Sequence, residues 1–477
     1  MTNYDDYLME SYELREKLVS DKFRPKYHFL PPEGRWNDLN GAMYWNGRYH
    51  LGYLQKISNG PNQRDFSSWQ HISSRDLLHW TYHQAYLREP LEGQKGDYFN
   101  SGDAMEGVEV PTIITNMPRK GICIYQCHDE NLDHWEPLAE NPVIPIEDGW
   151  SRQTNTLGPE AKFPECVIFD PSGWKEGQTY YALIGNKNYR PGYEGDSTSL
   201  FKSKDLKAWQ YVGPFYQSDR KWTVEEEDCA CSDFFPFGQK HMLVMHTHQP
   251  YSKCQYYIGQ YRNERFYPEV NEQISHLGSM LAGPETLIDG MGRRLFWGWI
   301  AEARATGSYG WDSIMTVPWH FIPTSDNRLR IHPVEELKNL RYNQQNVPDV
   351  SLSAQEERAI DGLASDCMEL QMTIDPIEAQ RFGLKLLCSP NCEEETIIIY
   401  DHGQKEFVID FEKASTNEEL VYPCGKYGKP LTSGNLKQTV PYVLEKKQIL
   451  NLTILVDKSV IEIFVNGDIC LVQRVYP

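Results

Sequence analysis

Ser74-Arg75-Asp76-Leu77-Leu78-His79-Trp80 is the stretch that decides the fold, because the chain repeats it. It recurs as Ser203-Lys204-Asp205-Leu206-Lys207-Ala208-Trp209, and more weakly as Asn131-Leu132-Asp133-His134-Trp135. Each copy follows a strand-like stretch and ends on tryptophan. A strand-and-turn unit that returns about every 50 residues, with insertions, is typical of radially arranged four-stranded sheets. A shared hairpin turn is the simpler explanation, but three copies with tryptophan in register favour a β-propeller.

The rest of the chain has the same texture. Short runs rich in Tyr, Ile, Val and Trp alternate with clusters of Gly, Asn, Asp and Pro, which is typical of an all-β protein. The exception is residues 3–19, whose apolar positions at helical spacing predict one amphipathic helix. We expect a helical lead-in at residues 1–22, a propeller at 23–342, a linker at 343–357 and a smaller β-sandwich at 358–477.

Composition excludes several classes of partner. The 477 residues include 47 Lys and Arg against 67 Asp and Glu, a net charge of −20, which argues against nucleic-acid binding. Mean hydropathy is −0.60, and no apolar run reaches the length of about 18 residues that a membrane-spanning helix needs. Aromatic residues make up 13% of the chain, which fits sheet packing better than a dedicated binding surface.

Cysteine usage and the absence of cofactor motifs narrow the function further. The chain holds 11 cysteines, an odd number, and its start has no basic segment followed by an apolar stretch. Both observations predict a cytoplasmic protein. No phosphate loop or nucleotide fingerprint is present, so no cofactor is expected. The pattern Cys229-x-Cys231 with His246-x-His248 lacks the usual zinc spacing, and we interpret it as buried thiols and hydrogen-bonded histidines, not a metal site.

Trp36-Asn37-Asp38-Leu39-Asn40-Gly41 precedes a predicted strand and carries a recognisable motif. It resembles the WMNDPNG signature of glycoside hydrolase family 32, the family of invertases, inulinases, levanases and fructosyltransferases. The resemblance runs in the family's order along most of the chain. Residues 49–55 resemble YHLFYQ, residues 74–80 resemble SxDLxHW, residues 99–104 resemble FSGSA, and residues 456–467 resemble VDRSSVEVFVNDG.

The resemblance implies a five-bladed β-propeller with a funnel at its axis, followed by a C-terminal β-sandwich. It also implies retaining chemistry at a β-fructofuranoside, in which one carboxylate attacks the anomeric carbon and another protonates the leaving oxygen. By position, Asp38 is the nucleophile. Asp170 matches the aspartate of the family's RDP motif, which grips two sugar hydroxyls, and Phe169 replaces the arginine. An alternative alignment through Glu165-Cys166 leaves the following strand out of step.

The general acid is harder to place. The family's ECPDFF motif corresponds to residues 230–235, which puts Ala230 where the acid glutamate belongs. Alanine cannot donate a proton, so the acid has moved or has been lost. Side chains two apart on a strand share a face, so Asp228 can reach the site, whereas a bulge brings Glu227 there instead. Both are candidates, since two carboxyl groups in different environments make this chemistry.

The motif segments also supply candidates for sugar binding. Sugar sites combine flat aromatic faces with side chains that hydrogen-bond hydroxyl groups. Most other Trp and Tyr residues are expected to pack between blades. The expected substrate-binding residues are Trp36, Asn37, Gln55, Trp69, Phe99, Ser101 and Phe169.

Three functions fit these residues. The leading hypothesis is hydrolysis of a β-fructofuranosidic bond in a small saccharide through a covalent fructosyl-enzyme. Fructosyl transfer, including the formation or opening of difructose anhydrides, keeps the covalent step and changes the acceptor. The third is a sugar-binding propeller without catalysis, in which Ala230 records the loss of the acid. A different furanoside is a further alternative, because Phe169 removes the arginine fork that clamps hydroxyls.

Overall fold

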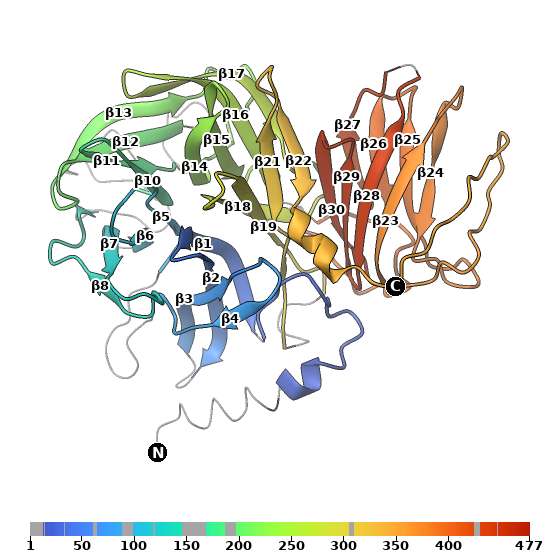
Figure 1. Ribbon diagram of the computed structural model, residues 1–477, viewed down its shortest axis with the longest axis horizontal. Helices are drawn as coiled ribbons and strands as arrows, with labels where there is room; N and C mark the ends of the chain where they lie inside the picture. The colour runs from blue at the N-terminus through green and yellow to red at the C-terminus, as the bar shows by residue number, and fades with distance from the viewer. Residues whose placement is uncertain are drawn as a thin grey trace.

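The computed structural model describes residues 13, 15–32, 34–60, 64–87, 99–117, 120–145, 168–186, 197–304, 310–423, 430–445 and 447–477. The molecule is all-β, with a ring of sheets on one side and a sandwich of sheets on the other (Figure 1). This confirms the predicted fold class, a β-propeller followed by a β-sandwich. Most of the helix predicted for residues 3–19 and the pair Glu165-Cys166 lie outside the described residues.

Five antiparallel sheets of consecutive strands form the ring in the described residues before Glu335. The first holds β1 (Arg35–Trp45), β2 (Arg48–Gly60), β3 (Arg64–Ser74) and β4 (Trp80–Tyr82). The second holds β5 (Gly102–Ala104), β6 (Thr112–Met117), β7 (Gly121–Cys127), β8 (Trp135–Pro137) and the short β9 (Ile144–Pro145). The third holds β10 (Pro171–Glu176), β11 (Thr179–Ile184), β12 (Ser197–Ser203) and β13 (Trp209–Gln217). The fourth holds β14 (Ala230–Phe237), β15 (Lys240–Thr247), β16 (Lys253–Arg262) and β17 (Arg265–Gln273). The fifth holds β18 (Leu281–Ile288), β19 (Arg294–Ile300), β20 (Ile314–Met315), β21 (Trp319–Pro323) and β22 (Leu329–Pro333).

The first strand of each sheet lies innermost. β1 contacts β5 and β18, β5 contacts β10, and β14 contacts β10 and β18, so the inner strands close a ring. Figure 1 shows these strands around the axis, with β4, β8, β13 and β17 on the outside. Each sheet is continuous in sequence, and the ring closes where Gly34 pairs with Trp311. The motif that contains Asp38 therefore lies on an axial strand.

The repeated stretch forms the turn between the third and fourth strands of a sheet. In the first sheet, Asp76 Oδ1 accepts two backbone N–H groups of the turn, at 3.0 and 2.9 Å. In the third sheet, Asp205 Oδ1 accepts the equivalent pair at 2.9 and 3.0 Å. Leu77 and Leu206 follow these aspartates with φ of 64° and 66°. The repeated stretch therefore stabilises a hairpin turn, and it does so at the same position in different sheets of the ring.

Hydrophobic side chains fill the spaces between neighbouring sheets. Trp36 and Trp297 are fully buried between the first and fifth sheets, Phe201 between the second and third, and Phe215 between the third and fourth. Fully burying one such side chain stabilises the fold by about 1.5–3 kcal/mol, whereas an exposed ion pair contributes at most about 1 kcal/mol. Packing between sheets is therefore the main force that holds the ring together.

The second part of the fold is a sandwich of two four-stranded sheets. It follows the 3-10 helix η2 (Glu335–Leu340) and an exposed, irregular stretch over residues 341–366. One sheet has the order β23 (Cys367–Ile374), β28 (Leu450–Asp457), β29 (Val460–Val465), β30 (Ile469–Arg474). The other has the order β24 (Arg381–Leu386), β25 (Thr396–Asp401), β26 (Glu406–Asp410), β27 (Lys437–Pro441).

Residues 26–28 tie the ring to the sandwich. Asp457, at the end of β28, accepts the backbone N–H groups of these three residues at 2.6 to 2.8 Å. Its Oδ2 also lies 2.9 Å from His28 Nδ1, and Glu462 Oε1 of β29 lies 3.2 Å from His28 Nε2. Burial alone would lower the pKa of His28, but hydrogen bonds to the two carboxylates raise it to about 9. A buried imidazolium between two carboxylates, the His28 anchor, thus joins the two parts.

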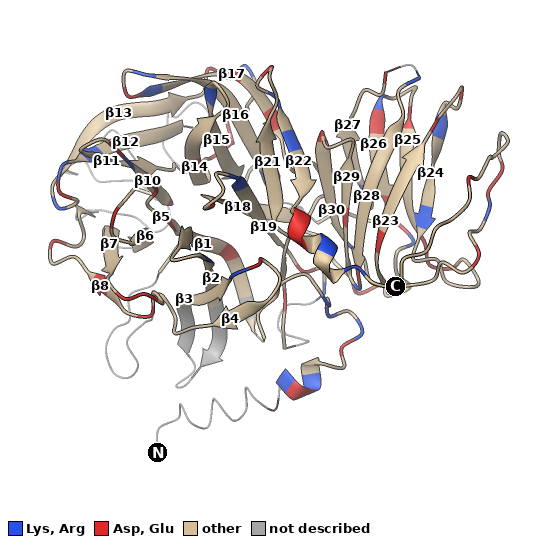
Figure 2. Ribbon diagram, viewed as in Figure 1, with Lys and Arg blue, Asp and Glu red and all other residues tan. Residues whose placement is uncertain are grey.

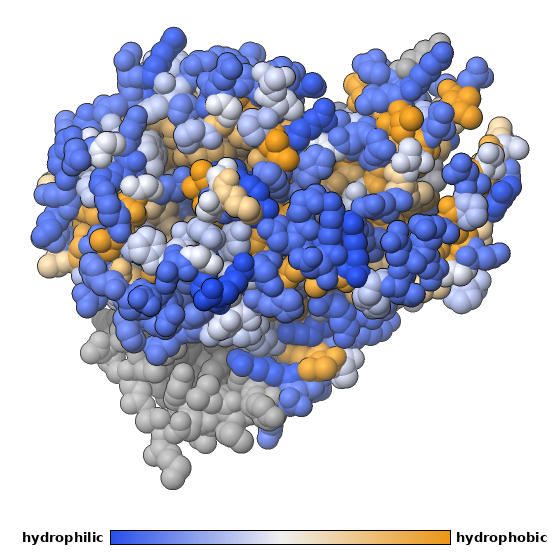
Figure 3. All heavy atoms as spheres, in the orientation of Figure 1, coloured by the Kyte–Doolittle hydropathy of each residue, from blue (hydrophilic) through white to orange (hydrophobic). Residues whose placement is uncertain are grey.

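Charged side chains of both signs are spread over the exterior. Figure 2 shows Lys and Arg interspersed with Asp and Glu. Figure 3 shows a mainly hydrophilic face with scattered hydrophobic residues. On this face, the described residues form no basic patch of the kind that nucleic-acid binding requires. No helix in the described part of the chain has the length and apolarity to cross a membrane.

Candidate active site

β-bulges interrupt three inner strands near the axis. Between Trp36 and Leu39, the register of β1 against β2 slips by one residue, so residues 37–38 bulge. Equivalent slips fall at residues 231–232 of β14 and 283–284 of β18. A bulge turns side chains out of the strand's regular alternation and is frequent beside active sites. Here the bulges bring Asp38, Cys231 and Gly283 to the wall of one cleft.

This cleft, with the solvent-open space at its mouth, spans about 580 Å³. Its lining combines carboxylates, amides and imidazoles with apolar surface, which is the mixture expected of a small-molecule site. The lining residues are Asn37, Asp38, Leu54, Asn100, Ser101, Phe169, Asp170, Cys231, His246, His248, Ala282, Gly283 and Trp299.

Asp38 is held by two neighbouring segments. Ser101 Oγ donates a short hydrogen bond to Asp38 Oδ2. Asn40 Nδ2 donates to the Asp38 backbone carbonyl at 3.0 Å, and Asn40 Oδ1 accepts the Gly102 N–H at 2.8 Å. Gly283, with φ of +52°, approaches so closely that a Cβ atom there would lie 2.9 Å from Asp38 Cβ. The carboxylate is therefore confined before any substrate arrives, as a positioned nucleophile requires.

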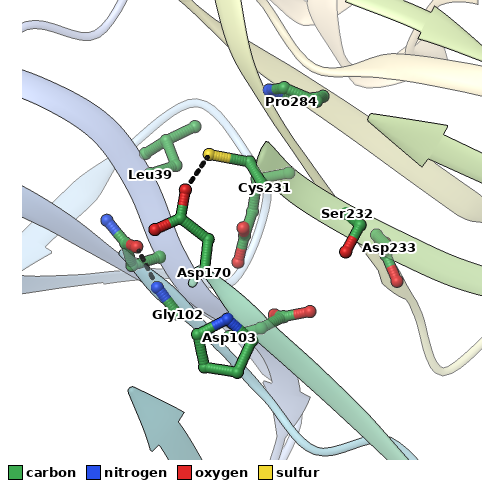
Figure 4. Close-up of a pocket in the computed structure, with 11 residues that line it drawn as sticks. Leu39, Gly102, Asp103, Asp170, Cys231, Ser232, Asp233 and Pro284 are labelled. Atoms are coloured by element: carbon green, nitrogen blue, oxygen red, sulfur yellow. Dashed lines mark hydrogen bonds between the residues drawn. The ribbon is translucent and has the colours of Figure 1, made fainter. Parts of the chain in front are cut away.

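Cys231 lies between the two predicted catalytic aspartates. Its Sγ is 3.7 Å from Asp170 Oδ2 and 3.8 Å from Asp38 Oδ2, and Figure 4 shows the sulfur directed at the Asp170 carboxylate. Burial, with the negative charges of Asp170 and Asp38, raises the pKa of the Cys231 thiol well above its usual value. The thiol thus stays protonated and donates weakly to both carboxylates. Asp38 and Asp170 face one space, as the motifs predict.

Glu227 and Asp228, the two candidates for the acid, are buried and do not line the cleft. Glu227 receives hydrogen bonds from Lys253 Nζ and Gln255 Nε2, both at 3.0 Å, one on each carboxylate oxygen. Asp228 Oδ1 accepts from the His248 N–H at 2.6 Å, and its Oδ2 lies 2.8 Å from His248 Nδ1. Burial alone would raise the pKa of Asp228, but the charge and hydrogen bonds of His248 lower it.

His246 and His248 reach the cleft although the motifs did not select them as catalytic. They lie two residues apart where β15 ends, and His246 pairs with Ala230 on the neighbouring β14. The sequence did contain a signal, the His246-x-His248 pattern, because residues two apart in an extended segment share a face. Cys231 was visible in the same pattern.

The substrate-binding candidates divide into two groups. Asn37, Ser101 and Phe169 line the cleft. The others are buried away from it. Trp36 packs against Tyr53, Phe99 packs edge-on against Tyr125, Gln55 lies on β2 opposite Trp36, and Trp69 donates from Nε1 to the Asn100 carbonyl at 3.0 Å. Trp69 thus supports the loop that carries Ser101, and the aromatic faces in the cleft come from Phe169 and Trp299.

One group in the described part of the chain has ligand atoms close enough together for a metal ion: His71, His83 and Asp133. It lies between the first and second sheets, away from the cleft. The rings of His71 and His83 stack with centroids 4.3 Å apart and planes inclined by 21°. In that arrangement the nitrogen lone pairs lie in nearly parallel planes and do not converge on one ion. Ser73 Oγ, 2.6 Å from His83 Nε2, completes a hydrogen-bonded packing cluster.

A second, much smaller pocket lies on the axis beside Asp170 and is lined by further carboxyl groups (Figure 4). These are Asp103 of β5, Asp233 of β14 and Glu285 of β18. Burial raises the pKa of Glu285 to about 8 and that of Asp233 to about 6. Burial and the charge of Glu285 raise the pKa of Asp103 as well. Near neutral pH, Glu285 therefore keeps its proton.

Glu285→Gln should flatten the decline of stability with pH. From its ordinary pKa of 4.5 to about 8, the native protein holds a proton that the unfolded chain releases, so stability falls as pH rises. The difference should reach a few kcal/mol, since one pKa unit corresponds to about 1.4 kcal/mol. Denaturant unfolding across this range measures it, with exposed Glu136→Gln as control. The same slope in wild type and Glu285→Gln would contradict the assignment.

Known glycosidases are similar to this chain over most of its length. It is 24% identical to a sucrose-6-phosphate hydrolase of Zymomonas mobilis, in a match that covers 95% of this chain and 86% of that relative. It is 26% identical to a β-fructofuranosidase, insoluble isoenzyme 4, of Oryza sativa, over 96% and 84%. Its fold matches fructan 1-exohydrolase IIa of Cichorium intybus with a TM-score of 0.77, at 19% identity, over 96% and 92% of the two chains.

Two family models cover nearly the whole chain. The N-terminal domain of glycosyl hydrolases family 32 matches residues 28–333, and the C-terminal domain of the same family matches residues 336–477. The first match contains Asp38, Asp170 and all other residues of the cleft. With an axial cleft that Asp38 and Asp170 line together, the chain belongs to glycosyl hydrolase family 32, a family of glycosidases that cleave fructosidic bonds.

Proposed function

We propose that the protein hydrolyses β-fructofuranosidic bonds in a small, uncharged saccharide, with Asp38 as nucleophile. The observation that carries this proposal is the placement of Asp38, which a bulge, Ser101 and Gly283 hold at the wall of the axial cleft. Its carboxylate attacks the anomeric carbon and forms a fructosyl-enzyme, which water then hydrolyses with retention. Family membership supports this chemistry.

Asp170 faces the same space and braces the sugar. Its carboxylate accepts hydrogen bonds from ring hydroxyls, and these strengthen as positive charge develops in the oxocarbenium-like transition state. Phe169, beside it, offers an apolar face where other family members carry an arginine, and Trp299 offers another. The cleft therefore grips its sugar by stacking and carboxylate hydrogen bonds, without a guanidinium fork among its described residues.

Glu227 and Asp228, the sequence candidates for the general acid, do not line the cleft themselves. Asp228 connects to the cleft through its contact with His248, which lines it. Glu227 is occupied by Lys253 and Gln255.

The cleft lining supports a neutral substrate. None of the described residues that line it is a lysine or an arginine, and a phosphorylated sugar calls for such a cation. The relative in Zymomonas mobilis is named for a phosphorylated sugar, whereas a solved chicory fructan exohydrolase contains 1-kestose. Sucrose and short fructo-oligosaccharides fit better here. All nine cysteines in the described residues are free thiols, which supports a reducing, cytoplasmic location.

The test is product analysis with a panel of neutral and phosphorylated fructosides. We expect release of fructose from sucrose or 1-kestose, with a much lower kcat/KM for sucrose 6-phosphate. Fructosylated products at high substrate concentration, without free fructose, would identify a transferase. Binding without cleavage of any furanoside would identify a sugar-binding propeller and overturn the proposal.

A further inference from the structure

Ala230 leaves the cleft without the side chain that other family members use as acid. In β14, Ala230 is fully buried and pairs with His246 of β15. Paired residues of antiparallel strands place their side chains on the same face of the sheet. Because position 230 of β14 carries only a methyl group, it leaves room beside the end of β15. The side chains that line the cleft from the end of β15 are His246 and His248.

Asp228 holds His248 in a defined orientation. Oδ2 of this carboxylate lies 2.8 Å from His248 Nδ1, and Oδ1 accepts the backbone N–H of His248 at 2.6 Å and a hydrogen bond from Thr247 Oγ1 at 3.0 Å. The Asp228 side chain is 7% exposed and that of His248 is 13% exposed. A buried carboxylate on one ring nitrogen fixes the tautomer and stabilises the imidazolium.

We propose that His248, positioned by Asp228, is the general acid and base of this enzyme in place of the missing glutamate. The inference rests on the proposed function, because it assigns the proton donor for that reaction. Nδ1 is engaged by the carboxylate, so Nε2 delivers the proton. Asp228 is a positioning residue, since it acts through His248.

The two half-reactions balance. In the first, a carboxylate oxygen of Asp38 bonds to the anomeric carbon, the glycosidic C–O bond breaks, and the leaving oxygen takes the proton from His248 Nε2. In the second, neutral Nε2 removes a proton from water, the water oxygen bonds to the anomeric carbon, and Asp38 leaves as carboxylate. Both proton transfers thus use one ring nitrogen, and no cofactor is consumed.

Other acidic groups near the cleft suit the role less well. Both oxygens of Glu227 are tied to Lys253 and Gln255, and neither oxygen lines the cleft. Cys231 has its pKa raised well above the usual range by burial and by the two aspartates, which makes its thiol a weak proton donor. Glu285 keeps a proton near neutral pH, but it lines the small axial pocket and not the main cleft, and its Oε1 accepts the Ala42 N–H at 2.7 Å.

His248→Ala should make activity depend on the leaving group. With sucrose, whose leaving oxygen must be protonated, kcat/KM should fall by about 10²–10⁴-fold. With a nitrophenyl β-fructofuranoside, whose leaving group needs no proton, the first step should continue and produce a burst of nitrophenol. The slow second step should leave one fructosyl group on the protein, and mass spectrometry of the intact chain detects it.

His79→Gln is the matched control, because His79 Nδ1 and Asp76 Oδ2 form an equally short pair of 2.8 Å on the surface. It should behave as wild type with both substrates. His248→Gln, whose side chain is closer in size to histidine than alanine is, provides a second variant in case His248→Ala fails to fold. Thermal melts of all variants identify any folding defect. Equal losses with both substrates in the folded variants, or leaving-group dependence in Glu227→Gln or Glu285→Gln instead, would overturn the assignment to His248. A wild-type enzyme that cleaves neither substrate would overturn the proposed function itself.

Asp228→Asn tests the positioning role. Without the carboxylate, the ring of His248 loses the partner that fixes its tautomer and orientation. The loss of activity should therefore depend on the leaving group, as in His248→Ala: kcat/KM should fall strongly with sucrose and little with the nitrophenyl β-fructofuranoside. Equal losses with both substrates would indicate a purely structural role and contradict the inference.

Discussion

Asp38→Asn is expected to lower kcat for sucrose or 1-kestose by about 10⁴-fold or more, the scale of loss seen when a catalytic group that acts in a set is removed. An amide oxygen carries no negative charge and forms no stable bond to the anomeric carbon. The substitution keeps the size of the side chain, and Ser101 Oγ can still donate to the amide oxygen. Its effect should therefore fall on the chemical step, not on folding.

The measurement is initial rate with the best fructoside from the panel, together with a thermal melt. Asp326→Asn, at an exposed turn between β21 and β22, is the control and should keep full activity. Asp170→Asn should also lose activity, because its carboxylate braces the transition state. An Asp38→Asn enzyme that retains more than about one tenth of wild-type kcat would exclude Asp38 as nucleophile.

His28→Gln should lower the free energy of unfolding by about 3–5 kcal/mol, a large loss for a single substitution. The imidazolium lies between Asp457 and Glu462, and all three side chains are fully buried. Without it, two buried carboxylates lose their positive partner. Glu462 keeps hydrogen bonds from Trp319 Nε1 and the Val317 N–H, at 2.8 and 3.0 Å, but these carry no full charge.

The substitution should also change the pH dependence. Because the pKa of His28 is raised to about 9, the anchor contributes fully below the unfolded value of 6.5 and is lost as pH rises through 9. Wild type should therefore lose more stability over that window than His28→Gln does, and the difference is the contribution of the anchor. Denaturant unfolding at several pH values measures both effects. His402→Gln, a half-buried histidine of the sandwich, is the control. If the free energy of unfolding of His28→Gln and of wild type changed in parallel with pH, the assignment of a buried imidazolium at His28 would be wrong.

The fold was largely predictable because its signals are local. In the two stronger copies of the repeated stretch, the aspartate caps its own turn, so one short sequence identifies the connection between strands three and four. Alternating apolar and turn-forming residues likewise mark strands without knowledge of their partners. The predicted domain boundaries stay predictions, although η2 and the exposed stretch after it lie in the expected region.

The site was less predictable because β-bulges determine which side chains of the inner strands face the cleft. Asp38 and Asp170 follow from motifs, but the register slip after Trp36 turns that indole into the core while Asp38 faces the cleft. A slip depends on the neighbouring strand, which no local pattern reveals. Trp69 and Phe99, which were expected in the funnel, also lie in the core, where they pack between the first and second sheets. The His246-x-His248 pattern indicates two histidines on one face, but the proposed role of His248 depends on Asp228, 20 residues earlier, and on the small residue at position 230, which no local pattern connects with it.

The His28 anchor has a consequence for the order in which the molecule assembles. Its partners lie 429 and 434 residues later in the chain, on the last strands of the sandwich. During synthesis, each blade can form from its own contiguous segment as it emerges. The buried ion triad cannot form until residue 462 has been made. Contacts of such long range form late, because closing the loop costs conformational entropy before the contact stabilises the fold. A growing chain thus carries His28 without its two carboxylate partners until β28 and β29 have been made, so the joint between ring and sandwich forms after both parts exist.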